Sequence, residues 1–346
     1  MGRIDISTGK LGLSRKDWQR ALPGLLISLV SLGLVLYFVD LQELRQALLL
    51  ADYRFIAAGA LVTIFWLLVR GKVWQTLLPE RVPYKTVFFT LSEGYLLNNI
   101  LPFRLGEVGR AFLLNQKTPL RFWQVFSSIM IERVLDLAFA TALLISTLAF
   151  VVGGEWARQA ALGVGLVSSI GLLGLYLMAR NRDWVLNLFT RLSARWPFLN
   201  RFGGKALPAF ISGLGVLMDG KRFVKAVGWM VFNWGLGVLQ FYVYLLAFFP
   251  DARLLWAGFS LGAAGLGIAA PSSPGAVGVL ELTLVAALSL FDLNPSYAFA
   301  FAVTAHFLNY LIIGVLGAYA LSKDNETLVG LFQQARLKLH KTARPT

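Results

Sequence analysis

The chain has 346 residues, of which 57% are hydrophobic and 14% are charged, and its formal net charge is +14. Soluble domains carry about 25% charged residues, so this composition excludes a soluble globular protein or a large solvent-exposed enzyme domain. The apolar residues form long runs, and a helix of about 20 such residues crosses the roughly 30 Å hydrocarbon core of a bilayer. We therefore predict an all-α polytopic membrane protein.

Cysteine and histidine content limits the chemistry further. The absence of Cys excludes disulfides, iron–sulfur clusters, thiolate zinc sites and Cys nucleophiles. The two His residues, His306 and His340, leave little material for a nitrogen-ligated site, so we expect no metal and no cofactor. In a membrane protein, the excess of Lys and Arg indicates positive cytoplasmic loops and anionic headgroups rather than nucleic acid.

Taken in chain order, the apolar segments predict the helices. They lie at 21–39, 55–70, 84–101, 123–152, 160–179, 223–249, 254–270, 278–291 and 297–321. The first follows basic residues but has no small-residue cleavage site after it, so we predict a retained transmembrane helix rather than a signal peptide. Together they predict about seven to nine membrane segments.

Lys and Arg concentrate in the two terminal tails and at 70–85 and 180–222, which predicts that these regions and both termini are cytoplasmic. The expected organisation is a cytoplasmic N-terminal tail, one transmembrane domain and a basic cytoplasmic C-terminal tail, at 1–20, 21–321 and 322–346.

Two halves are expected within the transmembrane domain, at 55–152 and 223–321. They would be joined through 183–218, where apolar residues such as Trp184, Leu188 and Leu192 share one helical face. This pattern predicts an amphipathic helix on the cytoplasmic leaflet, the alternative being a partner-binding or regulatory helix.

Segment 84–101 conflicts with this orientation if it crosses the bilayer, because the stretches on both sides of it are positive. The conflict disappears if the chain turns at Asn98-Asn99-Ile100-Leu101-Pro102 and leaves by the same face. Pro102 removes a backbone donor, and Asn98 and Asn99 can bond the groups that are freed at a break. We therefore predict a re-entrant hairpin.

A second Pro- and Gly-rich break follows at 270–278 and matches the first at a constant offset of 169 residues. Two hairpins that enter from opposite faces would form an inverted repeat with broken helices, as in secondary transporters. The alternative is two unrelated loops. The residues at the predicted hairpin breaks are Pro102, Gly106 and Gly109, and Pro271, Pro274, Gly275 and Gly278.

Ionisable side chains inside membrane segments are costly unless paired, and they are therefore candidate site residues. One cluster follows the first break, and a second lies within 123–152; Glu281 follows the second break. The functional interpretation has Arg104 and Arg110, with Asn98 and Asn99, receiving an anionic headgroup, because Arg can bond two phosphate oxygens at once. The residues that we expect to act in charge relay or pairing are Glu107, Glu132, Arg133, Asp136 and Glu281.

The alternative for these clusters is charge pairing that only seats the hairpin, and the two interpretations do not exclude each other. Asp292 and His306 are further polar groups whose participation the pattern does not decide. A lone His in an apolar helix is more often a packing donor than a ligand or a relay.

Three motifs follow one another along the chain: Asn99-Ile-Leu-Pro-Phe-Arg-Leu-Gly-Glu-Val-Gly-Arg110, Glu132-Arg-Val-Leu-Asp136, and Pro271-x-x-Pro-Gly-x-x-Gly-x-x-Glu281. Together they resemble the lysylphosphatidylglycerol synthase transmembrane-region family, also called the flippase-like domain family. The resemblance covers roughly 20–325. It implies a membrane domain that binds and translocates lipids, here without the aminoacyl transferase domain to which some members are fused. Ala276 departs from the family, which commonly has Gly there.

The leading functional hypothesis is a flippase-like transporter, not an enzyme, that moves an anionic phospholipid or polyprenyl-phosphate lipid across the bacterial inner membrane. Its partners would be membrane lipids and lipid-synthesising enzymes. Two alternatives stay open: a membrane-embedded glycosyltransferase that uses a polyprenyl-phosphate sugar, and a non-transporting scaffold for lipid-biosynthesis enzymes. The lipid, the direction of transport, its energy source and the oligomeric state do not follow from the sequence.

Overall fold

A computed structural model describes residues 15–101, 105–148, 155–196, 203–204, 206–268 and 273–323. All regular structure in these ranges is helical. The first half contains α1 (Arg15–Phe38), α2 (Leu41–Leu50), α3 (Tyr53–Leu77), α4 (Tyr84–Ile100), α5 (Leu105–Lys117) and α6 (Phe122–Leu148). The linking region contains α7 (Glu155–Arg180), α8 (Arg182–Arg195), α10 (Ala206–Gly213) and η2 (Leu214–Leu217). The second half contains α11 (Gly220–Leu246), α12 (Leu254–Gly267), η3 (Pro274–Ala276), α13 (Val279–Ser289) and α14 (Pro295–Lys323).

Three helices in the described ranges, α3, α11 and α14, are each long and apolar enough to cross a membrane. The α1 and α2 helices together would make a fourth span, but they are bent by 85° at Val39–Asp40. Asp40 caps α2 at this bend, where its carboxylate accepts hydrogen bonds from the backbone of Gln42 and Glu43. The prediction of a helical membrane protein is confirmed.

One predicted boundary is wrong. The segment that we ended at residue 70 continues as α3 to Leu77, so Arg70 and Lys72 lie inside a helix rather than in a loop. Arg70 is only 3% exposed. The helix continues because Arg70 reaches carboxylates on α6, which compensate the charge that made this position look like a loop.

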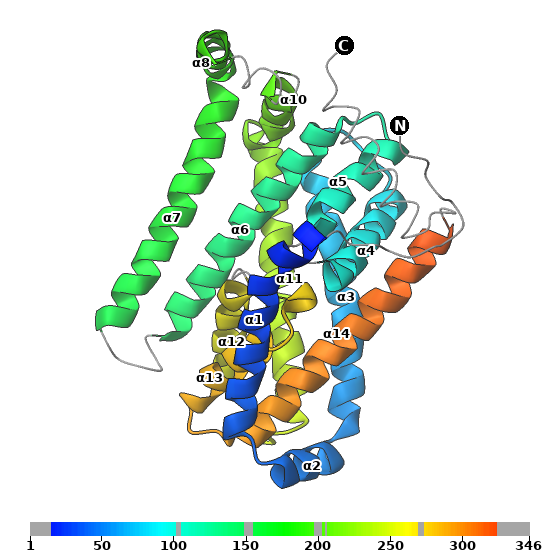
Figure 1. Cartoon of the computed structure of the whole chain (residues 1–346), viewed down its shortest axis with the longest axis vertical. Helices are drawn as coiled ribbons and strands as arrows, with labels where there is room; N and C mark the ends of the chain where they lie inside the picture. The colour runs from blue at the N-terminus through cyan, green and yellow to red at the C-terminus, as the bar shows by residue number, and fades with distance from the viewer. Residues whose placement is uncertain are drawn as a thin grey trace.

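The α3 and α11 helices form the centre of the molecule and pack along each other. Gly59 leaves room for the ring of Tyr244, and the hydroxyl of Thr63 lies 3.0 Å from that of Tyr244. Further along α3, the Trp66 carbonyl accepts a hydrogen bond from the Asn233 side chain at 2.9 Å. These contacts run in opposite directions along the two helices, so α3 and α11 are antiparallel. In Figure 1, α8 and α10 lie at one end of the molecule and α2 lies at the other.

The first hairpin consists of α4 and α5. A Cβ atom at Gly106 would overlap the carbonyl oxygen of Gly94, and one at Gly94 would lie 2.8 Å from the Cβ of Arg110, so the two helices are antiparallel and nearly touch. Lys117 near the end of α5 reaches Glu93 on α4 at 2.7 Å. The turn residues Pro102, Phe103 and Arg104 lie outside the described residues.

The second hairpin consists of α12, η3 and α13. Its helices are also antiparallel, since the ring of Trp256 lies 5.9 Å from that of Phe291 while Gly267 packs against Thr283. At its tip, Gly275, Ala276 and Gly278 have φ values of 68°, 62° and 85°. This left-handed backbone costs a non-glycine residue such as Ala276 about 1–2 kcal/mol. Pro271 lies outside the described residues.

The elements of the two halves correspond at the same offset of 169 residues. Shifted by this number, α3 to α6 fall on α11, on α12, on η3 with α13, and on α14. The packing corresponds as well, because α4 packs on α14 as α12 packs on α6, while η3 lies against α4. The two hairpins therefore meet where the tip of the second touches the first, and in Figure 1 they approach this point from opposite ends of the molecule.

Candidate functional site

Glu132 lies at the centre of a buried ion network beside the first hairpin. Its side chain is fully buried on α6, and its carboxylate contacts three guanidinium groups. Arg110 on α5 approaches Oε2 at 2.7 Å, while Arg70 on α3 and Arg133 on α6 approach Oε1 at 2.5 and 3.0 Å. One carboxylate thus joins α3, α5 and α6.

Arg70 is the residue of this network that the sequence analysis missed. It bonds both carboxylate oxygens of Asp136, with Nη1 donating to Oδ1 at 2.7 Å. Its Nε donates to the hydroxyl of Tyr95 on α4 at 3.1 Å, and its Nη1 lies 3.4 Å from Oδ1 of Asn233 on α11. Arg70 therefore joins the first hairpin to both central helices. The available signal was the apolar pattern continuing past it through Val73, Trp74 and Leu77.

Arg133 completes the network at its more exposed side, where 27% of its side chain is accessible. It lies 3.4 Å from Glu107 on α5 and 3.4 Å from Asp136. We call these six side chains the α6 ion network. It balances three cations against three anions: Arg70, Arg110 and Arg133 with Glu107, Glu132 and Asp136. Removing one partner of a buried pair typically costs about 3–5 kcal/mol, because an uncompensated charge stays behind.

Some buried donors near this network have no hydrogen-bond acceptor among the described residues. They include Nε of Arg110 and Nδ2 of Asn99; Oδ1 of Asn98 is likewise unpaired within those residues, whereas Nε of Arg133 faces Glu107 at 3.4 Å. Arg110 also places its guanidinium 4.2 Å from the ring centre of Trp74, so its position is fixed by both charge and stacking. A buried donor without an acceptor costs about 1–3 kcal/mol, and an anion would satisfy it.

A second buried polar group lies at the second hairpin. His306 on α14 is 8% exposed, and its Nδ1 lies 2.5 Å from Oε1 of Glu281 on α13. Glu281 also accepts the backbone N–H of Gly278 at 2.7 Å and so caps α13. These side chains line an otherwise apolar groove of about 590 Å³ along α14, together with Val277, Val303, Phe307, Tyr310, Leu311, Gly314, Val315 and Ala318.

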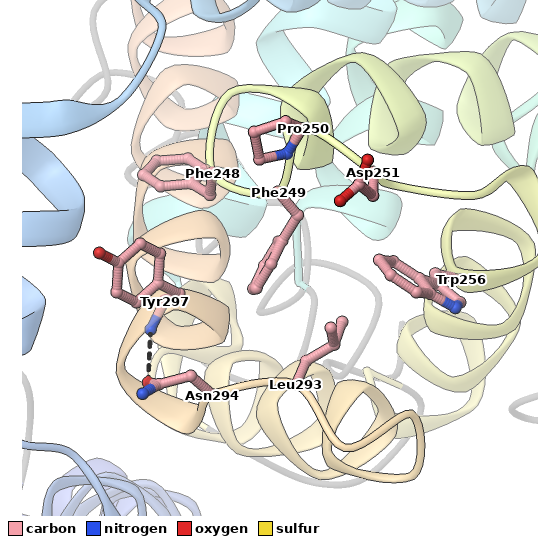
Figure 2. Close-up of a pocket in the computed structure, with 8 residues that line it drawn as sticks. All are labelled: Phe248, Phe249, Pro250, Asp251, Trp256, Leu293, Asn294 and Tyr297. Carbon is pink, nitrogen blue, oxygen red and sulfur yellow. Dashed lines mark hydrogen bonds between the residues drawn. The ribbon is translucent and has the colours of Figure 1, made fainter.

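A third feature, an aromatic pocket of about 300 Å³, lies near the end of the molecule that carries α2. Figure 2 shows the rings of Phe249, Tyr297 and Trp256 around it, with Asp251 at its upper edge and Leu293 below. The Phe249 ring lies 6.4 Å from that of Trp256 and 6.1 Å from that of Tyr297. Tyr and Trp rings at the ends of membrane helices are typical of the membrane–water interface.

The predicted site residues thus fall into separate groups. The structure brings Arg110, Glu107, Glu132, Arg133 and Asp136 together, with Gly106 and Asn98 in contact at the hairpin. Glu281 belongs to the other hairpin, where it contacts His306 and Gly278, and His306 in turn contacts Gly275. Asp292 lies in the turn before α14 at φ 57°. Arg104 lies outside the described residues, so its role stays a prediction.

Comparison with curated proteins gives three relatives. The chain is 25% identical to "Glycosyltransferase AglD" of Haloferax volcanii over 90% of its own length, but it spans only 55% of that protein. It is 20% identical to "UPF0104 membrane protein MJ1595" of Methanocaldococcus jannaschii, covering 86% of this chain and 93% of the relative. It is also 25% identical to "UPF0104 membrane protein MJ1078" of the same organism, over 64% and 91%.

No solved structure matches the chain. A family model described as "Lysylphosphatidylglycerol synthase TM region" matches residues 22–317, which include every described helix from α2 to α13 and most of α1 and α14. The motifs around Arg110, Glu132 and Glu281 lie within the matched range. The chain therefore belongs to the lysylphosphatidylglycerol synthase transmembrane-region family.

Proposed function

We propose that this protein is a lipid transporter that binds an anionic headgroup beside the first hairpin and moves the lipid across the plasma membrane. The lipid is an anionic phospholipid or a polyprenyl phosphate, and both termini are cytoplasmic. The observation that carries the proposal is a pair of buried donors, Arg110 Nε and Asn99 Nδ2, that have no acceptor among the described residues. A phosphate group supplies several acceptor oxygens and so matches this pair.

The placement of these donors supports an anion site. Arg110 and Arg133 both contact Glu132, so the two guanidinium groups lie close to one carboxylate. The α5 helix begins at Leu105 beside the turn of the first hairpin, and the N-terminal amides of a helix favour an anion. The network has no net charge without a ligand. A headgroup would therefore be bound by hydrogen-bond donors that are already in position, and not by a large excess of positive charge.

An inverted repeat forms part of the proposal. It is supported by the element correspondence at 169 residues and by the matching contacts α4 with α14 and α12 with α6. Two half-length hairpins, with η3 of the second against α4 of the first, resemble the broken helices at which transporters hold their substrates near the bilayer midplane. In this arrangement the first hairpin enters from the cytoplasmic face and the second from the opposite face.

The topology can be tested because the chain contains no Cys. Single Cys residues at Arg81 and at Lys117 should both resist a membrane-impermeant thiol reagent in intact cells and react after permeabilisation, since the re-entrant hairpin places both on the cytoplasmic side. Asp251→Cys, in the loop between α11 and α12, is the matched control that should react in intact cells. Labelling of only one of the first two positions would contradict the re-entrant arrangement.

A second candidate function is glycosyl transfer from a polyprenyl-phosphate sugar. The name of the Haloferax relative favours it, but this chain spans only 55% of that protein. Both candidates bind a phosphate-bearing lipid, and they differ in whether a glycosidic bond is made.

The transport proposal is tested with the full chain in liposomes that contain fluorescently labelled lipids on both leaflets. A membrane-impermeant quencher then reports how fast labelled lipid from the inner leaflet reaches the outer one. We expect labelled phosphatidylglycerol or polyprenyl phosphate to move faster than in protein-free vesicles. Labelled phosphatidylcholine should move poorly, because its quaternary ammonium would lie close to the guanidinium groups that surround Glu132. Rates equal to those of protein-free vesicles for the whole anionic panel would contradict lipid transport.

A further inference from the structure

The Glu281–His306 pair holds the tip of the second hairpin through a chain of hydrogen bonds. Besides Nδ1 facing Glu281 at 2.5 Å, the Nε2 of His306 lies 3.1 Å from the carbonyl oxygen of Gly275. Glu281 in turn accepts the N–H of Gly278. Both glycines belong to the tip, so this one pair fixes its two sides to α13 and α14.

The number of protons in the pair follows from this geometry. The Gly275 carbonyl can only accept, so Nε2 must carry a hydrogen. The contact between Nδ1 and Oε1 then needs a second proton, on the imidazole or on the carboxyl group, since otherwise two lone pairs would face each other at 2.5 Å. The pair therefore contains one proton more than a neutral imidazole beside an ionised carboxylate.

Loss of this proton must break one of the two contacts. If the remaining hydrogen stays on Nε2, the Nδ1 lone pair opposes the Glu281 carboxylate; if it moves to Nδ1, the Nε2 lone pair opposes the Gly275 carbonyl. Besides this pair, the tip is held by the Ser273 N–H, which donates to the Ser28 hydroxyl on α1 at 2.9 Å, and by packing of η3 on α4. Ala276 works against these contacts, because its left-handed conformation is unfavourable for alanine. The other contact on α14 is weak, with the Tyr310 hydroxyl 3.4 Å from the Pro274 carbonyl.

From these contacts we propose that the Glu281–His306 pair is a proton-binding site, and that release of its proton frees the tip of the second hairpin. Both side chains of the pair line the groove along α14, so the pair lies at a surface of the described residues rather than in a closed interior. The site sits in the half of the molecule that lacks the α6 ion network. The inference does not depend on lipid transport, because it concerns only the protonation and movement of the hairpin.

The surrounding helices add few ionisable groups that could compete for this role. Tyr310 shares the groove with the pair, and α12 carries no ionisable residue. On α1, Tyr37 is the ionisable residue in the range 26–38, and it is 82% exposed. The other helices packed on α13 or α14 carry further ionisable side chains that are bonded elsewhere. Among them, Glu93 pairs with Lys117, Tyr95 bonds to Arg70, Glu43 bonds to Asn294, and Tyr244 bonds to Thr63.

The test measures how fast a water-soluble thiol reagent labels the tip as the pH changes. Val277→Cys reports the tip, since Val277 is 43% exposed and precedes Gly278; Ile100→Cys, 47% exposed at the first hairpin, is the control for thiol ionisation. We expect the rate at Val277→Cys, divided by that at Ile100→Cys, to rise roughly fivefold from acid to alkaline pH as the tip is released. A ratio that stays constant across the range would overturn the proposal.

Two variants make the test specific. In the Glu281→Gln variant, the amide N–H can donate to Nδ1 while its oxygen still accepts from Gly278, so it imitates the protonated pair and should keep labelling slow at every pH. His306→Leu removes both bonds and should keep labelling fast at every pH. If His306→Leu does not fold, Glu281→Gln alone decides, because a wild-type pH response in Glu281→Gln would also overturn the proposal.

Discussion

Replacing Arg70 by Gln should destabilise the protein severely. Arg70 contacts both Glu132 and Asp136, and its loss leaves the α6 ion network with two cations against three anions, all largely removed from water. Breaking such a pair costs about 3–5 kcal/mol. The midpoint of thermal unfolding in detergent, followed by size-exclusion chromatography, should fall by roughly 5–15 °C.

A matched control and a rescue identify the cause. Arg54→Gln removes an Arg from an exposed position of the same helix and should leave the midpoint nearly unchanged. Combining Arg70→Gln with Asp136→Asn restores the balance of charge and should recover a large part of the loss. If Arg70→Gln melts like Arg54→Gln, the ion network does not hold α3 to α6.

The helices could be predicted from the sequence because apolar runs in a membrane protein are long and uninterrupted. The apolar segment 84–101 became α4 at Tyr84–Ile100, and 223–249 became α11 at Gly220–Leu246. The failure at Arg70 has a physical cause: a charge ends an apolar run in a sequence, but it does not end a helix when partners from other helices neutralise it. Those partners lie 62 and 66 residues further along the chain, at Glu132 and Asp136, and no local pattern connects them.

The two clusters differ in how visible they were. The acids and bases around Glu132 were recognisable as candidates because several lie in one apolar helix, although their pairing was not. His306 appeared isolated, because its partner Glu281 and its acceptor Gly275 lie on other elements, 25 and 31 residues away. The close contact between Gly94 and Gly106 likewise depends on the hairpin turn and could only be recognised as a Gly-rich break.

Replacing Arg110 by Lys should uncouple folding from transport. Lys keeps the positive charge that Glu132 requires, so the network stays neutral and the variant should purify in normal yield. It loses the planar fork, the Nε donor and the stack on Trp74, which in our account hold the headgroup. We expect the rate at which labelled phosphatidylglycerol or polyprenyl phosphate crosses the bilayer to fall about tenfold or more.

The most direct test of the central claim, that the first hairpin and its buried arginines handle the lipid headgroup, compares these rates in one set of liposomes. Wild type, Arg110→Lys and Arg253→Lys are reconstituted at equal protein content, Arg253 being an exposed Arg that also lies over a Trp ring, 6.0 Å from that of Trp256. The account predicts fast anionic-lipid movement with wild type and Arg253→Lys, and slow movement with Arg110→Lys. Equal rates for wild type and a fully folded Arg110→Lys would contradict it.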